Sequence, residues 1–327
     1  MHRTLRNHDT NFRPPLTDPA ATMKTKSTTY VPHVRILLAT HNGASWLDEQ
    51  LDSISTQQDV RVTIIASDDR SSDGTVSTLT RWANRITLDM LPLSHKRFGS
   101  AHRNFLRLIR DTELGDADYF ALSDQDDIWL PGKLLRGIYC LRSQNAQGYS
   151  SNVTAFWPDG RKKRIDKAHP LQSLDHLFSA PGPGCTFVIP RAVFIGLQAF
   201  VVENFDRLQT IWVHDWLIYA FVRAQGGKWH IDPQSNMLYR QHGNNEIGVN
   251  YGWRAALSRL KRVRSGAYRR DILAIADSVG ESDYIVEALR RFRFIDRLSL
   301  ILNVRRFRRR YTECVYLAFL FLIMPSS

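Results

Sequence analysis

Cysteine is scarce in this sequence, and its spacing excludes two ways of holding a small fold together. Among 327 residues there are three cysteines, Cys140, Cys185 and Cys314. Three scattered thiols form neither a disulfide framework nor a zinc-binding spacing, and they are typical of a reducing compartment. No apolar segment near the first residue resembles a secretory signal. These absences lead us to expect a cytoplasmic protein.

Two glycine-rich loops that commonly bind nucleotides are absent too. No G-x-G-x-x-G follows the first predicted strand, which argues against the dinucleotide site of dehydrogenases. No G-x-x-x-x-G-K-[ST] occurs either, which excludes a P-loop. A nucleotide bound by this chain would therefore be held by carboxylates and a metal ion.

Positive charge is unevenly distributed. The formal net charge is +12, and residues 254–311 contain 16 Lys and Arg against 6 Asp and Glu. The basic run 305–310 is followed by an apolar run, 315–324, which is too short to span a bilayer. Such a pair favours a helix lying on an anionic membrane surface. A helix that packs on the domain and leaves its arginines in solvent is the alternative. Because no nucleic-acid-binding motif accompanies the charge, we expect no nucleic-acid partner.

We predict three regions along the chain. Residues 1–31 are polar and interrupted by prolines, which indicates a disordered N-terminal tail. Residues 32–250 form the main domain, and residues 251–327 form a basic, mostly helical C-terminal region with an apolar end.

Apolar strands and amphipathic helices alternate through the first half of the main domain. The predicted strands cover residues 34–39, 60–66, 86–91 and 119–122. Short connections between them indicate an α/β fold with a mostly parallel, Rossmann-like sheet and helices on both faces. Ligands of such sheets bind at the carboxyl ends of the strands. Polar clusters lie at those ends: 40–42, 68–69, 96–97 and 124–127.

The acidic cluster after the fourth strand is the most informative of these. Asp124, Asp126 and Asp127 follow a buried apolar run within four positions. Their mutual repulsion costs stability unless a cation lies among them. A divalent ion held by one or two carboxylates and by substrate phosphates fits this need. The alternative is a solvated acidic turn that caps the helix beginning near Pro131.

Several motifs, taken in order, resemble glycosyltransferase family 2, and most closely its bacterial rhamnosyltransferase-like members. The motifs are THNG at 40–43, SDDRSSDGT at 67–75, SDQDDIW at 123–129 and YRQHGNN at 239–245. The resemblance covers about residues 33–247 and implies the nucleotide-sugar-binding fold called GT-A. It also implies inverting, metal-dependent transfer of one sugar, with rhamnose as a candidate, from a dTDP- or UDP-sugar. The implied acceptor is a hydroxyl of a glycan or lipid-linked glycan in cell-surface polysaccharide assembly, on the inner face of the cytoplasmic membrane.

The resemblance also assigns roles to residues. It implies that the nucleotide sugar is bound by Thr40, Asn42, Asp68, Asp69, Arg97, Asp124, Gln125 and Asp127. Mg²⁺ or Mn²⁺ would be bound by Asp126, with Asp124 and His242 as further ligands. For His242 a hydrogen bond to the diphosphate is the alternative, and for Arg97 an exposed surface position.

The second half of the main domain carries the implied catalytic base. Asp215 interrupts an apolar run between Trp212 and Trp216, and burial there would raise its pKa toward neutrality. Trp129, Gly184 and Trp216 are assigned to the acceptor. For Trp129 the alternative is a buried anchor at the start of a helix. Two other functions remain open: a sugar nucleotidyltransferase, and a non-catalytic GT-A-like binding protein.

Overall fold

The computed structural model describes residues 30–211, 213–242 and 265–325. Almost all of the predicted N-terminal tail, Trp212, the end of the YRQHGNN motif and the start of the predicted C-terminal region lie outside these ranges. From Val31 onward the described residues belong to one compact unit.

The first half of the central sheet is parallel, as predicted. Its strands run in the order β3 (Leu88–Met90), β2 (Arg61–Asp68), β1 (His33–Thr40) and β4 (Tyr119–Ser123). They are joined by α1 (Leu47–Ser55), α2 (Thr75–Ala83) and α3 (Ala101–Asp111). Thr40 pairs with Asp68 and Leu38 with Ser123, so the carboxyl ends of the three longer strands lie at one edge.

The second half of the sheet is mixed, which the sequence did not predict. After β4 come β8 (Val188–Pro190), β6 (Gly148–Phe156), β9 (Trp229–Arg240) and β5 (Ile128–Trp129), and β7 (Lys162–Ile165) pairs with β6. The β4–β8, β8–β6 and β9–β5 pairs are antiparallel, while β6 and β9 are parallel. Residues 229–240 form one continuous strand, β9, which is the longest of the described strands.

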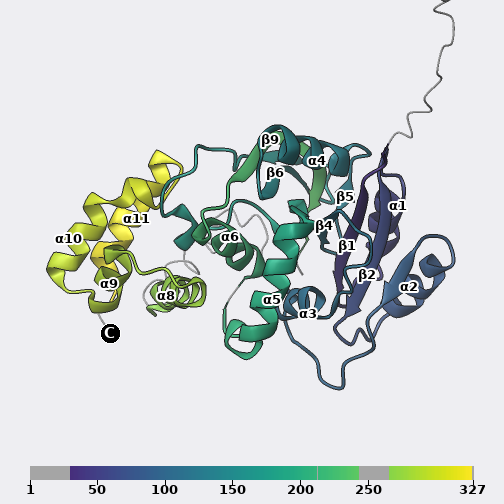
Figure 1. Ribbon diagram of the computed structural model, residues 1–327, viewed down its shortest axis with the longest axis horizontal. Coiled ribbons are helices and arrows are strands. Elements are labelled where there is room, and N and C mark those ends of the chain that lie inside the picture. Colours follow the sequence, from purple (N-terminus) through teal and green to yellow (C-terminus); the bar gives the residue numbers. More distant parts are fainter. Residues whose placement is uncertain (1–29, 212, 243–264, 326–327) are drawn as a thin grey trace, which may run out of the picture. The chain divides into compact units, whose positions relative to one another are not determined.

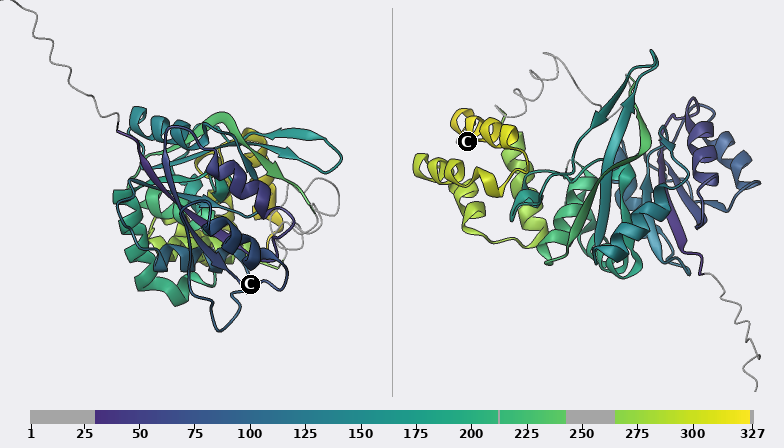
Figure 2. Two further views of the ribbon diagram at one scale, coloured as in Figure 1. Left: turned by 90° about the vertical axis from the view of Figure 1, so that its right-hand side faces the viewer. Right: turned by 90° about the horizontal axis from the view of Figure 1, so that it is seen from above.

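Helices cover both faces of the sheet, as Figures 1 and 2 show. Alternate residues of β1 enter different cores, because successive side chains of a strand point to opposite faces. Val34, Ile36 and Leu38 belong to the core with α1, α2 and α4 (Lys133–Ser143). Leu37 and Ala39 belong to the core with α3, α5 (Arg191–Leu208) and α6 (His214–Ala224).

The C-terminal part is helical, with α8 (Ala267–Val279), α9 (Tyr284–Arg291), α10 (Phe294–Leu302) and α11 (Tyr311–Ile323). Successive helices pack on one another, and their inner residues join the core that contains α6. Phe307, in the link between α10 and α11, stacks on Phe178 with ring centroids 4.2 Å apart. Across the described ranges, every helix is too short or too polar to cross a membrane.

Candidate active site

The loops after β1 and β2 are fastened to each other by the acids of the second motif. Asp68 accepts hydrogen bonds from the Thr40 hydroxyl at 3.0 Å and from the Ser71 backbone and hydroxyl at 2.8 and 2.6 Å. Its carboxylate is buried. The structure thus brings Thr40 and Asp68 together, as the parallel register requires.

Asp69 holds a different loop. It accepts hydrogen bonds from the backbone N–H groups of Phe98 and Gly99, the latter at 2.8 Å. The half-exposed Arg97 guanidinium lies 3.7 Å from the same carboxylate. The predicted cationic residue is therefore at the same edge of the sheet as the acids, with its charge directed toward them.

Gln125 joins the loops after β4 and β1. Its amide accepts from the His41 backbone N–H at 2.8 Å and donates to the His41 carbonyl at 2.9 Å. A side chain at position 43 would collide with this amide, which explains Gly43. Asn42 adopts a left-handed conformation, with φ of 47°, and its side-chain oxygen accepts from the Ser72 N–H at 2.8 Å. The structure thus gives Gln125 and Asn42 loop-fastening contacts, while their contact with a nucleotide sugar stays a prediction.

The three carboxylates after β4 differ in environment. Asp124 is half-buried, Asp126 is 9% exposed and Asp127 is fully buried. Burial, followed by the charges of Asp126 and Asp124, raises the pKa of Asp127 well above its ordinary value. Asp127 accepts from the Arg240 backbone N–H at 3.1 Å. Its buried position and its hydrogen bond to the backbone of β9 suit Asp127 to positioning the loop.

Asp126 is paired with His242. The Oδ2 atom of Asp126 lies 2.7 Å from Nε2 of His242, and the imidazole stacks on Trp46 with centroids 3.9 Å apart. Arg240 donates from Nε to the Asp126 carbonyl at 2.7 Å. Carboxylate oxygens and an imidazole nitrogen are donors that suit Mn²⁺ or Mg²⁺. Asp126 and His242 thus present two suitable donors side by side, while metal binding by Asp126, Asp124 and His242 stays a prediction.

Cys185 is a buried thiol next to the acid cluster 124–127. Its sulfur and the carboxylates of Asp124 and Asp127 lie within 4.8 Å of one another. Burial, followed by the charges of Asp127 and Asp124, raises the thiol pKa well above its ordinary value. A thiol is a soft ligand and suits a hard cation such as Mg²⁺ poorly.

Lys133 is a buried cation that sequence reasoning missed. Its ammonium lies 3.5 Å from the centroid of the Trp129 ring and has no hydrogen-bond partner among the described residues. Burial lowers its pKa to about 7. Trp129 itself is 2% exposed, which favours its interpretation as a core anchor beside α4 over that of a wall of the acceptor pocket.

Asp215 lies in the first turn of α6. Its side chain is half-buried and accepts the backbone N–H of Trp216 at 2.7 Å. Burial raises its pKa to about 6, against the opposing effects of the Trp216 N–H and of the Lys167 ammonium. A carboxylate with a pKa near neutrality is well matched to removing a proton from a hydroxyl group.

The neighbours of Asp215 are fixed by close packing. His214 stacks on Phe105 with centroids 4.0 Å apart, and burial lowers its pKa to about 3, so the imidazole is neutral. A Cβ at position 184 would collide with that imidazole, so the close approach that requires Gly184 is to His214. Trp216 is 6% exposed and donates its indole N–H to the His176 carbonyl at 2.8 Å. These contacts explain how Gly184 and Trp216 contribute to packing, and acceptor binding by the two residues stays a prediction.

A short helical turn connects the acid cluster with Asp215. In η2 (Gly184–Thr186), Gly184 lies beside Asp215, and the sulfur of the next residue, Cys185, lies within 4.8 Å of a carboxylate oxygen of Asp127. A Cβ on Gly184 would lie 3.4 Å from the Cβ of Asp215. Two carboxylates that are far apart in sequence thus lie beside adjacent residues of one turn.

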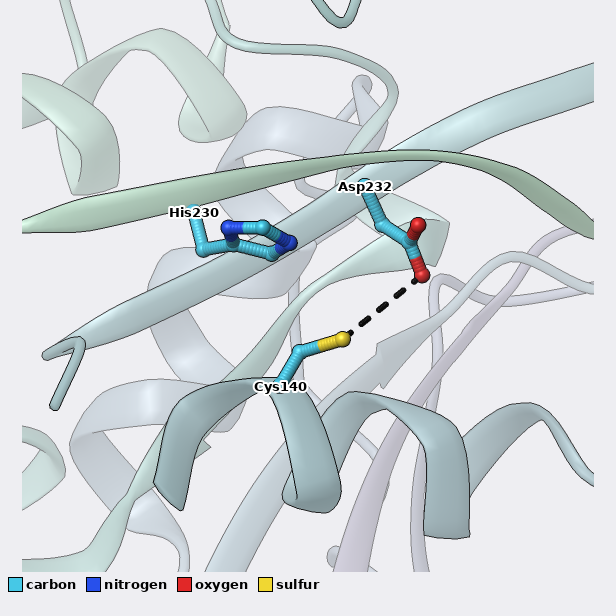
Figure 3. Close-up of side chains that lie close together, drawn as sticks. All are labelled: Cys140, His230 and Asp232. Carbon is cyan, nitrogen blue, oxygen red and sulfur yellow. Dashed lines mark hydrogen bonds between the residues drawn. The ribbon is translucent and has the colours of Figure 1, made fainter. Parts of the chain in front are cut away.

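A second group of potential metal ligands has a structural explanation. Figure 3 shows Cys140, His230 and Asp232 close together, with the Cys140 sulfur 3.8 Å from the Asp232 carboxylate. The two oxygens of Asp232 already accept from the Arg136 guanidinium at 2.8 and 3.1 Å, and one also accepts from the Tyr149 hydroxyl at 3.1 Å. The Arg136 guanidinium thus already neutralises this buried carboxylate.

Comparisons with known proteins agree with this geometry. The model for "Glycosyl transferase family 2" matches residues 35–248, so the chain belongs to that family and is a glycosyltransferase. It is similar to the dTDP-rhamnosyl transferase RfbG of Shigella flexneri, with 39% identity over 88% of this chain and 99% of that protein. An uncharacterized glycosyltransferase of Nostoc, alr2836, is 23% identical over 65% of this chain and 66% of its own length.

Solved structures share the GT-A fold. S. aureus TarS in complex with UDP-GlcNAc superposes with a TM-score of 0.57 at 12% identity, covering 83% of this chain and 76% of that chain. The mannosyltransferase PcManGT of Pyrobaculum calidifontis, in complex with GDP-Man and Mn²⁺, superposes with a TM-score of 0.51 at 15% identity, covering 90% and 85%. At these identities the likeness concerns the fold alone.

Proposed function

We propose that this glycosyltransferase transfers one rhamnose from dTDP-rhamnose, with inversion, to a hydroxyl of a glycan or lipid-linked glycan acceptor. The position of η2 carries the proposal, because its Gly184 lies beside Asp215 and its Cys185 lies within 4.8 Å of the Asp127 carboxylate, which brings the base close to the acid cluster. The choice of donor is supported by the similarity to the Shigella dTDP-rhamnosyl transferase over 99% of that protein.

Asp215 is the general base of this reaction. Its carboxylate takes the proton of the acceptor hydroxyl while the oxygen attacks the anomeric carbon on the face opposite the leaving diphosphate. Asp126, with Asp124 and His242, would hold a divalent cation, and a bound cation of this kind stabilises negative charge on the leaving group. Thr40, Asp68 and Asp69 shape the nucleotide pocket, and Arg97 contributes positive charge near the phosphates.

We also propose that the C-terminal helices dock on an anionic membrane surface, where a lipid-linked acceptor would be found. Exposed apolar side chains gather on α10 and α11: Phe294, Ile295, Leu298, Leu302, Val315, Phe319 and Leu322. The surrounding region has the strongest positive balance in the chain. Apolar burial combined with attraction to anionic lipids is the usual basis of such binding. Co-sedimentation with anionic but not with neutral vesicles tests it.

A transfer assay tests the proposed function. The purified protein is incubated with Mn²⁺, a rhamnose-containing glycan acceptor and either dTDP-rhamnose or a UDP-sugar, and products are identified by mass spectrometry. Release of dTDP with a product heavier by one deoxyhexose supports the proposal. Release of pyrophosphate from a nucleoside triphosphate would indicate a nucleotidyltransferase instead. Nucleotide binding without turnover on any acceptor would indicate a binding protein.

A further inference from the structure

Asp175 is a fully buried carboxylate that the proposed chemistry does not use. It lies in η1 (Asp175–Leu177) and accepts from the Tyr219 hydroxyl at 2.8 Å and from Arg223 at 3.2 Å. Tyr219 and Arg223 follow Asp215 by four and eight positions on α6, so the three residues lie along one side of that helix. Asp175 therefore fastens the side of α6 that carries the catalytic base.

Arg309 completes this arrangement from outside the catalytic domain. It lies between α10 and α11, beyond the residues that the family model matches. Its Nη1 atom lies 3.2 Å from Asp175 Oδ2, and its Nη2 donates to the Ala180 carbonyl at 2.6 Å. The side chain of Arg309 is 7% exposed. In the basic run 305–310 this arginine is thus directed into the protein.

The two contacts of Arg309 lead to the two segments that surround Asp215. Through Asp175 it reaches α6, where Asp215 lies in the first turn. Through Ala180 it holds the start of the glycine- and proline-rich loop that ends at Gly184, which lies beside Asp215. A guanidinium can make both contacts at once because its donors form a planar fork.

We infer that Arg309 is a positioning residue that sets the geometry and burial of Asp215 by holding α6 and the 180–184 loop together. The inference rests on the proposed role of Asp215 as the base. It makes the C-terminal helices part of the catalytic unit. Without Arg309 the loop and the helix separate, water reaches the carboxylate, and proton removal becomes less efficient.

Arg309→Met tests the inference, with Arg310→Met as its matched control because Arg310 is the exposed neighbour in sequence. We expect Arg309→Met to lower kcat at least tenfold with little change in KM for dTDP-rhamnose or in dTDP affinity. The acid limb of its kcat–pH profile should shift below that of the wild type. Arg310→Met should match the wild type in both respects.

The outcomes separate this inference from the proposed function. The inference would be overturned if a folded Arg309→Met protein had the kcat and the acid limb of the wild type. It would also be overturned if kcat and dTDP affinity fell equally while the acid limb stayed in place. If Arg309→Met does not fold, Arg309→Lys carries the test by the same criteria, because lysine keeps the charge but cannot make both contacts. Asp215→Asn is measured in parallel. If Asp215→Asn still transfers the sugar, the assignment of Asp215 as the base is refuted. If Asp215→Asn is inactive while Arg309→Met behaves like the wild type, only the inference about Arg309 is refuted.

Discussion

Nε2 of His242 lies 2.7 Å from Oδ2 of Asp126, and the same imidazole is stacked on Trp46. The contact links the end of β9 to the acid cluster after β4, 116 positions earlier. It places a nitrogen donor beside the carboxylate that the third motif indicated as the principal metal ligand.

Asp126→Ala should abolish the effect of Mn²⁺ on nucleotide binding. The substitution removes the carboxylate that best fits the cation, so the cation can no longer join the protein to the diphosphate. Calorimetric titration of dTDP with and without Mn²⁺ measures this difference. Asp89→Ala, at an exposed acid in β3, should bind like the wild type. A metal-dependent gain in affinity that persists in Asp126→Ala would refute the assignment.

Activity should fall as the pH falls through about 6. Burial raises the pKa of Asp215 from 3.8 to about 6, and a general base acts only when it is deprotonated. The logarithm of kcat should therefore rise with pH up to that value and then level off. Measuring kcat between about pH 5 and 8 at saturating donor and acceptor checks this. An acid limb near the ordinary value of an aspartate would show that Asp215 is not the titrating group.

Gly184→Ala should lower kcat, although the substitution adds only one methyl group. An added methyl group would collide with the buried imidazole of His214, so the loop beside Asp215 must move. We expect a loss of stability of about 1–3 kcal/mol, typical of overpacking, and a reduced kcat. Chemical denaturation and the transfer assay give the two values. Gly132→Ala is the control because a methyl group there meets no atom within 4 Å; equal effects of both substitutions would contradict the explanation.

Lys133→Met should stabilise the protein. The Lys133 ammonium is buried over Trp129 without a hydrogen-bond partner in the described part of the chain. Replacing it with an apolar side chain of similar length should raise the free energy of unfolding by roughly 1–3 kcal/mol at neutral pH. Urea denaturation measures the change.

The pH dependence of that gain follows from the pKa of Lys133. Burial lowers it from 10.5 to about 7, although Asp127 and Cys185 act in the opposite direction. Between these values the unfolded chain binds more protons at this site than the folded chain, so the stability of the wild type rises with pH. The advantage of Lys133→Met should therefore be largest at pH 7 and below and should narrow toward pH 9. An advantage that is constant with pH would contradict this account.

Sequence reasoning predicted the local and periodic features of the site. Continuous apolar runs gave β1, β2 and β4, and the parallel rule brought Thr40, Asp68 and the acid cluster to one edge. It missed features that depend on non-local pairing. The antiparallel β8 and β5 are only three and two residues long, too short for an alternation signal.

Sequence reasoning also failed to predict which charged side chains are buried. Lys133 and Arg309 are residue types that are usually exposed, and Arg309 lies in a run that sequence alone assigns to solvent or a membrane. Only the fold reveals that Asp175, 134 positions away, is its partner.

The most direct test of the whole account is anomalous diffraction at the manganese edge from crystals soaked with Mn²⁺ and dTDP. The account predicts a manganese peak in contact with Asp126, the diphosphate against it, and Asp215 facing the same cavity. Manganese bound only at Cys140, His230 and Asp232, or dTDP in a cavity that Asp126 and Asp215 do not share, would contradict it.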